Sequence, residues 1–141
     1  MKKLMLIGVL GLLSMTSTYA QSSDIQLIEQ AIVTFAKAGD NQNVKAFEEV
    51  LDENYRVVMN RLFGGKKVAI LSRAVYLKKI KNKEFGGDKR EVSILSITIN
   101  GTTATAKVAL KGTKMTFNSL LTLVKNEVGE WLLISDVPVV N

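Results

Sequence analysis

Residues that could do chemistry are few in this chain of 141 residues, which contains no cysteine and no histidine. The missing histidine removes the commonest general base and every histidine-based triad, and the missing cysteine removes thiolate chemistry. Asp136, which follows Ser135, is the main candidate for acid–base chemistry. Strand alternation sets Asp136 on one face with Leu132 and Ile134. It is then either a carboxyl with a raised pKa among apolar neighbours or a strand-end residue in water. Because a carboxylate without a partner is a weak signal, we favour the second reading and predict no catalytic residue.

Aromatic residues with a few hydroxyl groups form the predicted ligand pocket. Aromatic walls and a small number of polar groups suit a planar molecule, although such side chains more often build the core. Trp131, the only tryptophan, is expected to be buried against Phe35 or its neighbours. Asn118 and Ser119 are adjacent on a predicted strand, so only one of them can face the pocket. The predicted pocket residues are Phe35, Tyr55, Tyr76, Phe117, Ser119 and Trp131.

The sequence predicts no metal site and no cofactor. It has no cluster with metal-ligand spacing and no phosphate-binding loop, since Gly64-Gly65 and Gly86-Gly87 are predicted to be turns. The formal net charge is +6, and much of it lies between Lys66 and Arg90. Such a run attracts anions, lipid headgroups or nucleic acids, but it is more often a solvated helix face. No nucleic-acid motif accompanies it, so we predict no nucleic-acid partner.

Residues 1–20 have the pattern of a secretory signal peptide. Lys2 and Lys3 precede the apolar run from Leu4 to Leu13, and Thr18-Tyr19-Ala20 places small residues at a cleavage site. The apolar run has about half the ~20 residues that a spanning helix needs, so we predict no stable membrane anchor. The absence of cysteine excludes a lipid-anchored lipoprotein. We therefore expect a periplasmic or secreted protein whose single domain comprises residues 21–141.

Three helices are predicted in the first part of that domain. Apolar residues recur at three- and four-residue spacing after Asp24, which is typical of an amphipathic helix. Ser23 or Asp24 is expected to cap this helix, and Gly39 to end it in the left-handed conformation. Asn43 is predicted to open the second helix and Ser72 the third.

The remaining residues predict an antiparallel sheet. Residues 55–71 read as a β-hairpin, and residues 90–137 alternate apolar and polar side chains. Asn100-Gly101 is the strongest signal of a two-residue hairpin turn. The alternation changes phase after Ile94, which predicts a β-bulge. Val137-Pro138 is expected to end the last strand, because proline cannot donate to a ladder.

Short motifs along the chain carry a resemblance to a known family. They are Phe35-x-x-Ala38-Gly39-Asp40, Phe47-x-x-x-Leu51, Asn100-Gly101-x-x-Ala104, Gly129-x-Trp131-x-x-x-Ser135-Asp136, the Gly64-Gly65 hairpin, and Tyr76-Leu77 with Phe85-Gly86-Gly87. With this order of elements the chain resembles the nuclear transport factor 2-like superfamily, and within it the small exported bacterial proteins called putative lumazine-binding. The resemblance implies an α+β fold in which about three N-terminal helices pack on a strongly curved mixed or antiparallel sheet, forming a cone.

Enzymes of this superfamily place acid–base groups in the mouth of the cone. One branch combines a carboxylate base with a tyrosine and a protonated carboxylic acid, and another uses histidine with aspartate. The histidine route is closed here, and the first helix carries Phe35 and no tyrosine. The motifs that carry the resemblance are structural, and no residue independently indicates a pteridine ligand.

Three hypotheses for function follow. The first is an exported, non-enzymatic domain that binds a small apolar or aromatic ligand in the cone. The second is a homodimeric interaction module, built on the outer sheet face, without a ligand. The third, which we favour least, is an enzyme of the isomerase or lyase type that uses Asp136 with Tyr55 or Tyr76.

Overall fold

The computed structural model describes residues 12–141, and side chains from Gln21 onward. Three helices pack on one six-stranded mixed sheet in the strand order β2-β1-β6-β5-β4-β3, in which only the β1–β6 pair is parallel. The predicted α+β class is therefore confirmed. The elements are α1 (Leu12–Asp40), α2 (Val44–Val50), β1 (Leu51–Asn60), β2 (Val68–Ser72), α3 (Arg73–Lys81), β3 (Glu91–Asn100), β4 (Thr103–Lys111), β5 (Thr116–Lys125) and β6 (Trp131–Val140).

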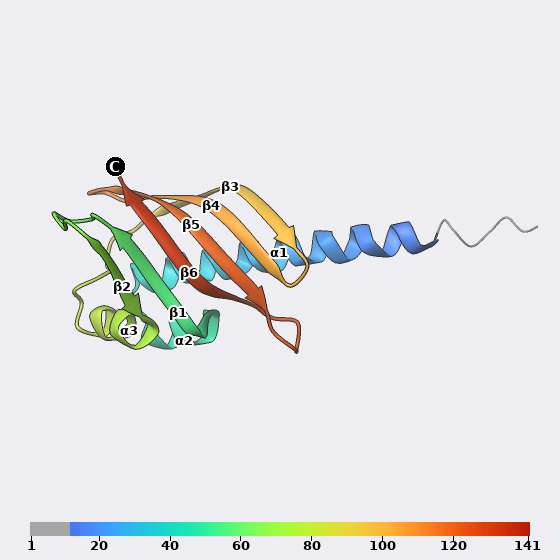
Figure 1. The fold of residues 1–141 in the computed structure, drawn as a ribbon, viewed down its shortest axis with the longest axis horizontal. Helices are drawn as coiled ribbons and strands as arrows, with labels where there is room; N and C mark the ends of the chain where they lie inside the picture. Colours follow the sequence, from blue (N-terminus) through green and yellow to red (C-terminus); the bar gives the residue numbers. More distant parts are fainter. Residues whose placement is uncertain (1–11) are drawn as a thin grey trace, which may run out of the picture.

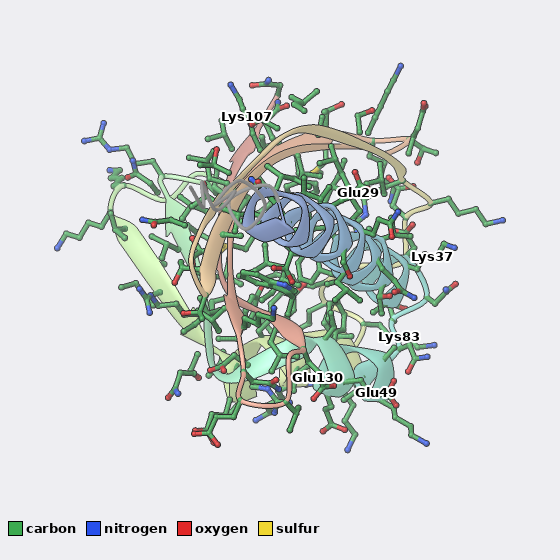
Figure 2. All side chains as sticks on the ribbon, turned by 90° about the vertical axis from the view of Figure 1, so that its right-hand side faces the viewer. Glu29, Lys37, Glu49, Lys83, Lys107 and Glu130 are labelled. Atoms are coloured by element: carbon green, nitrogen blue, oxygen red, sulfur yellow. The ribbon has the colours of Figure 1, made fainter. Side chains whose placement is uncertain are left out.

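The curved sheet partly encloses helix α1, which supplies more of the buried core residues than α2 and α3 together (Figure 1). A view close to the direction of α1 shows the strands bending around it, with the labelled charges of Glu29 and Lys37 at the surface (Figure 2). The inward-facing alternate residues of β4 are buried, as the sequence pattern predicts. They are Ala104, Ala106, Val108 and Leu110. No helix in residues 12–141 is long and apolar enough to cross a membrane.

Two of the predicted helix caps are present. The Asn43 side chain accepts a hydrogen bond from the Ala46 backbone N–H at 3.1 Å, and the Ser72 hydroxyl accepts one from the Val75 N–H at 3.3 Å. Each cap satisfies a donor that the first helical turn leaves without a partner. These caps fix the starts of α2 and α3, and thereby the places where the chain passes between helix and sheet.

The predicted start of α1 was wrong. The helix already begins at Leu12, so neither Ser23 nor Asp24 caps it. The Asp24 carboxylate instead accepts hydrogen bonds from the Trp131 indole N–H at 3.0 Å and from the Lys125 ammonium at 2.9 Å. Asp24 therefore joins the helix to the two central strands, β5 and β6, and these two contacts lower its pKa.

Gly39 does not end α1 in the left-handed conformation, which is a second correction. Gln42, with φ of 50°, adopts that conformation after the helix has ended at Asp40. A β-carbon on Gly39 would lie 2.6 Å from a terminal nitrogen of Arg90, and the Gly39 carbonyl accepts the Gly87 N–H at 3.0 Å. This glycine is therefore required for close approach of two chain segments rather than for its φ.

The sheet contains the predicted bulge and one feature that the sequence did not indicate. The pairing of β3 with β4 shifts between Ile94 and Ser96, as the phase change predicts. Strand β6, however, continues to Val140, and Pro138 lies within it opposite Ser119. The proline is tolerated because β1 pairs with β6 only as far as Asp136, so one side of β6 is an edge at this point.

Trp131 is 4% exposed, so its predicted burial is confirmed. Its described polar partner is Asp24, whereas the ring neighbours of Phe35 are Phe47 and Tyr55. We expect Trp131→Ala to lower the free energy of unfolding by about 3–5 kcal/mol, because it opens a cavity in the core. We expect Trp131→Phe, which keeps an aromatic ring, to cost less than half as much. Urea unfolding followed by circular dichroism measures both, and an unchanged midpoint for Trp131→Ala would contradict this account.

Candidate functional site

A cavity of about 660 Å³ lies on the concave side of the sheet, toward the end of the molecule that holds the β4–β5 hairpin. Its wall is mostly apolar, with contributions from α1, α3 and four of the strands. Such a volume and composition are typical of small-molecule sites. The lining residues include Phe35, Met59, Leu62, Phe63, Tyr76, Glu84, Asp88, Arg90, Thr113, Lys114, Met115, Phe117, Ser119, Asp136 and Pro138.

Three buried polar atoms without hydrogen-bond partners among the described residues lie at or beside the cavity wall. They are the Tyr55 hydroxyl, the Ser119 hydroxyl and one carboxylate oxygen of Asp136. The residues are 1%, 1% and 8% exposed, respectively. They come from the neighbouring strands β1, β5 and β6. Because an unpaired buried polar group costs about 1–3 kcal/mol, this cluster destabilises the fold unless something binds to it.

A bulge in β6 turns Asp136 inward. Thr122 pairs with Ser135 while Leu123 pairs with Leu133, so Ile134 is the extra residue. The extra residue reverses the alternation, and Asp136 therefore faces inward like Leu133 rather than outward like Leu132. The expectation that Asp136 lies in water at a strand end was wrong for this reason.

Burial raises the pKa of Asp136 to about 7. The nearby Ser119 hydroxyl and the charge of Arg90 act in the opposite direction, although no hydrogen bond of normal geometry satisfies the Ser119 hydroxyl. Burial likewise raises the pKa of Tyr55 and Tyr76 well above the ordinary value, and the charge of Asp136 contributes. The two tyrosines are therefore neutral donors at physiological pH, whereas Asp136 changes its protonation near neutrality.

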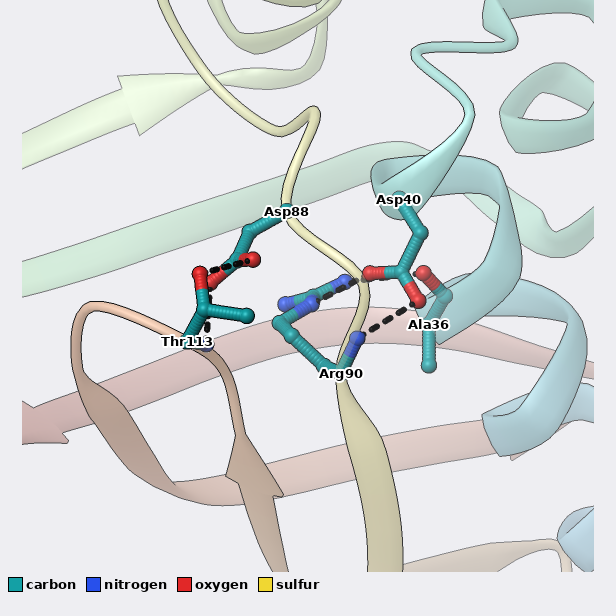
Figure 3. Close-up of polar contacts among 5 residues, drawn as sticks. All are labelled: Ala36, Asp40, Asp88, Arg90 and Thr113. Carbon is teal, nitrogen blue, oxygen red and sulfur yellow. Dashed lines mark hydrogen bonds and ion pairs between the residues drawn. The ribbon is translucent and has the colours of Figure 1, made fainter.

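Arg90 brings a positive charge to the cavity and is held firmly by the end of α1 (Figure 3). Its Nε donates to Asp40 Oδ1 at 2.6 Å, and one terminal nitrogen donates to the Ala36 carbonyl at 2.8 Å. The Arg90 backbone N–H donates to the other Asp40 oxygen at 3.1 Å. Because both side chains are only 14% exposed, this ion pair orders the segment that leads into β3.

Asp88 links two chain segments at the rim of the cavity (Figure 3). Its carboxylate accepts the Thr113 backbone N–H at 2.8 Å and the Thr113 hydroxyl at 2.7 Å. These hydrogen bonds lower the pKa of Asp88, the Thr113 hydroxyl being the largest cause. They join the segment between α3 and β3 to the β4–β5 hairpin and so define one side of the opening.

The arrangement suits an uncharged ligand with an apolar body and a polar edge. The Ser119 hydroxyl can donate to a carbonyl, and Asp136 can accept from or donate to the ligand according to its protonation. No group of three or more potential metal ligands occurs within residues 12–141. The site thus offers hydrogen bonding and proton transfer.

The model of the family described as "Putative lumazine-binding" matches residues 23–137. The chain belongs to the putative lumazine-binding family. No curated protein is significantly similar to it in sequence.

Solved structures show that this putative lumazine-binding chain has a nuclear transport factor 2-like fold. An NTF-2-like protein of unknown function from Silicibacter pomeroyi is 20% identical, with a TM-score of 0.75 over 86% of this chain and 98% of the other. One from Shewanella baltica is 16% identical, with a TM-score of 0.73 over 85% and 95%. An NTF2-like protein with a cystatin-like fold from Novosphingobium aromaticivorans is 17% identical, with a TM-score of 0.67 over 93% and 90%. At these identities the likeness concerns the fold alone.

The structure distributes the predicted pocket residues over two places. Phe35, Tyr76, Phe117 and Ser119 line the cavity. Tyr55 is not among the lining residues, although its ring packs against Phe35 and Tyr76 and its hydroxyl has no partner. Trp131 lies away from this cavity, beside Asp24 and a shallow depression against α1.

Sequence reasoning missed Arg90 and Asp88 as residues of the site. Both belong to the basic stretch that was read as a solvated helix face and turn. Their roles depend on contacts with Asp40 and Thr113, which are 50 and 25 residues away in the chain. No local pattern indicates such contacts.

The buried Asp136 of this putative lumazine-binding protein predicts a pH-dependent stability. Its folded pKa of about 7 lies above the ordinary value of 3.8, so the folded state binds the proton more tightly. The contribution of this group to stability is present at low pH and is lost as the pH rises through about 7. Relative to Asp136→Asn, we expect the free energy of unfolding to fall by about 3 kcal/mol between about pH 5 and pH 8.

Urea unfolding of both proteins over this range measures the difference. The carboxylates of Asp24, Glu84 and Asp88 have lowered pKa values, so their titration falls below this range and is common to both proteins. Parallel pH profiles for the native chain and Asp136→Asn would contradict the burial of an ionisable Asp136.

Proposed function

We propose that this protein binds a small, largely apolar molecule in the cavity, with a carbonyl or amide edge directed toward Asp136. The observation that carries this proposal is the set of unpartnered polar atoms of Tyr55, Ser119 and Asp136. A protein without a ligand gains nothing from leaving three such groups buried and unsatisfied. A ligand edge that bonds to Ser119 and Asp136, which line the cavity, removes the cost of these two groups, and its apolar part displaces water from the aromatic wall.

The family description supports a planar heterocycle as the ligand class. Lumazine is a bicyclic heteroaromatic ring that carries carbonyl groups next to ring N–H groups. A carboxyl group pairs with such an edge through two hydrogen bonds, and the rings of Phe35, Tyr76 and Phe117 offer faces on which it can stack. The apolar wall accommodates other flat molecules with the same edge, so we propose the chemical class rather than lumazine itself.

Native mass spectrometry of protein purified from its own cells tests this proposal. We expect a bound mass of a few hundred daltons, the range that a cavity of this size accommodates. Titration with the recovered compound should give an affinity about tenfold weaker for Ser119→Ala, because one donor to the ligand is lost. Ser135→Ala is the matched control, since Ser135 is also buried but does not line the cavity. An empty protein, or equal affinities for both variants, would refute the proposal.

We also propose that the protein is exported and that residues 1–20 are removed. The support is the charged, apolar and small-residue pattern of that segment, of which residues 1–11 lie outside the described residues. Cleavage after Ala20 would leave the contacts of Asp24 with Trp131 and Lys125 intact. The same mass spectrum reports the N-terminus: a mass that begins at Gln21 supports export, and an intact Met1 argues against it.

A homodimer through the outer sheet face is a second candidate. Leu95, Leu120 and Val139 are 58%, 57% and 55% exposed on strands of the sheet, beside outward-facing threonines such as Thr103 and Thr105. A stable pair would bury about 1,200–2,000 Å² in total. The measured mass of the native assembly distinguishes this candidate from a monomeric binding protein.

An acid–base enzyme is the third candidate, and the buried Asp136 favours it. A group whose pKa lies near 7 can abstract a proton next to a carbonyl group, while a tyrosine hydroxyl stabilises the resulting enolate. Tyr76 lines the same cavity, and the charge of Asp136 affects its pKa.

Deuterium exchange tests the enzyme candidate. If Asp136 transfers protons, the recovered ligand should incorporate deuterium from heavy water at carbon when the native protein is present. Exchange should fall by about 10²-fold or more with Asp136→Asn, which is the range for loss of a general base. Binding without exchange would leave the protein as a carrier only.

A further inference from the structure

The loop that joins β1 to β2 combines an exposed aromatic ring with unpaired basic side chains. Residues 61–67 read Arg-Leu-Phe-Gly-Gly-Lys-Lys. Phe63 is 63% exposed, and Arg61, Lys66 and Lys67 are also exposed. The ion pairs found within residues 21–141 do not involve these three cations. An exposed aromatic ring surrounded by free cations is the pattern that favours the interface of an anionic bilayer.

The backbone of this loop is adapted to present these side chains rather than to minimise strain. Arg61 and Phe63 have φ values of 56° and 51°, in the left-handed region that glycine and asparagine prefer. For a bulky residue such as Phe63 this conformation is unfavourable, and strain of this kind gathers at functional segments. Stability alone does not account for arginine and phenylalanine at these positions.

The same loop borders the opening of the cavity. Leu62 and Phe63 line the cavity together with Lys114 and Met115 of the β4–β5 hairpin. Figure 1 shows both hairpins at the same end of the molecule, near the C-terminus. A surface that bound this end would therefore face the cavity opening.

The acidic residues at the rim do not cancel this basic character. Glu84 is paired with Lys79 at 2.8 Å. Asp88 keeps its charge, but it is outnumbered by Arg61, Lys66 and Lys67 of the loop and by Lys114, which also lines the cavity. The β5–β6 hairpin at the opposite end of the molecule has the opposite charge. Its Val128 is 78% exposed, but the neighbouring Glu127 and Glu130 are acidic. Within residues 21–141, the β1–β2 and β5–β6 hairpins thus each have an exposed apolar tip, and the β1–β2 hairpin beside the cavity is the basic one of the two.

We propose that the β1–β2 hairpin docks reversibly on an anionic lipid bilayer, with Phe63 inserted at the level of the headgroups. Arg61, Lys66 and Lys67 provide the electrostatic attraction, and the ring provides the apolar contact. The cavity opening then faces the membrane. Direct passage of an apolar ligand between bilayer and cavity rests on the proposed binding function, whereas the docking itself does not.

A tryptophan placed at each hairpin tip tests the docking by position. Phe63→Trp and Val128→Trp are made in the full chain, so that residues 4–13 contribute equally to both. With vesicles of phosphatidylcholine and phosphatidylglycerol, we expect a blue shift and quenching by brominated acyl chains only for Phe63→Trp. Vesicles of phosphatidylcholine alone should give much weaker changes, and equal responses at both tips would overturn the proposal.

Vesicle co-sedimentation measures the energetic contribution of each group. We expect the partition coefficient on anionic vesicles to fall about tenfold for Phe63→Ser and about 30-fold for Lys66→Ala with Lys67→Ala. Val128→Ser is the matched control and should leave it unchanged. Added salt should weaken native binding.

Two results would overturn the proposal in these experiments. One is native binding to anionic vesicles that Phe63→Ser and the lysine variant leave unchanged. The other is a sedimentation velocity measurement in which Phe63→Ser converts a dimer to a monomer without changing vesicle binding, since the hairpin then contacts a second copy of the chain. A protein that docks but carries no ligand would refute the proposed binding function and leave the docking intact.

Discussion

The partly buried ion pair between Asp40 and Arg90 determines where helix α1 ends beneath the sheet, and the cavity depends on that position. The guanidinium group also donates a hydrogen bond to the Ala36 carbonyl, one of the carbonyl groups in the last turns of α1. It thereby holds the end of the helix against the segment that leads into β3. Removal of one partner destabilises the fold, because it leaves the other charge, which is only 14% exposed, without compensation. Gly39 and Gly87 allow the two segments to approach this closely. The charge that organises the fold at this point also reaches the cavity and affects the pKa of Asp136.

Stability and binding make opposing demands on the inner face of the sheet. Most of that face is apolar and fully buried, as in any domain of this size. At one end the same face contains Tyr55, Ser119 and Asp136, whose polar atoms have no partners among the described residues. The aromatic cluster of Phe35, Phe47, Tyr55 and Tyr76 packs edge to face or tilted and holds the tyrosine rings in fixed orientations. The polar groups are therefore preorganised by the core itself.

The fold could largely be predicted from local signals, whereas the site could not. Alternation in residues 90–137 and the caps at Asn43 and Ser72 each act over a few residues, and the structure contains them. The hairpin predicted at Asn100-Gly101 is also present, but its two turn residues are Gly101 and Thr102, because Asn100 pairs with Thr103. Asp136 was misplaced because one extra residue, Ile134, reverses the face of everything after it. The sequence marks the bulge in β3 by a change in apolar phase, but around Ile134 the residues are apolar on both faces and give no such mark.

The pairing of β1 with β6 has a consequence for the order in which the chain can fold. These parallel strands are joined by Leu51 with Leu133 and by Val57 with Asp136, contacts that span most of the domain. The hairpins formed by β3 to β6 join strands that are neighbours in the sequence. The sheet, however, is completed only when β6, the last strand, is available. A nascent chain can pair β1 with β2, but β1 lacks its second neighbour, β6, until synthesis is nearly finished. Contacts of such long range slow folding, because the entropy of loop closure is lost before the strand pair stabilises the chain.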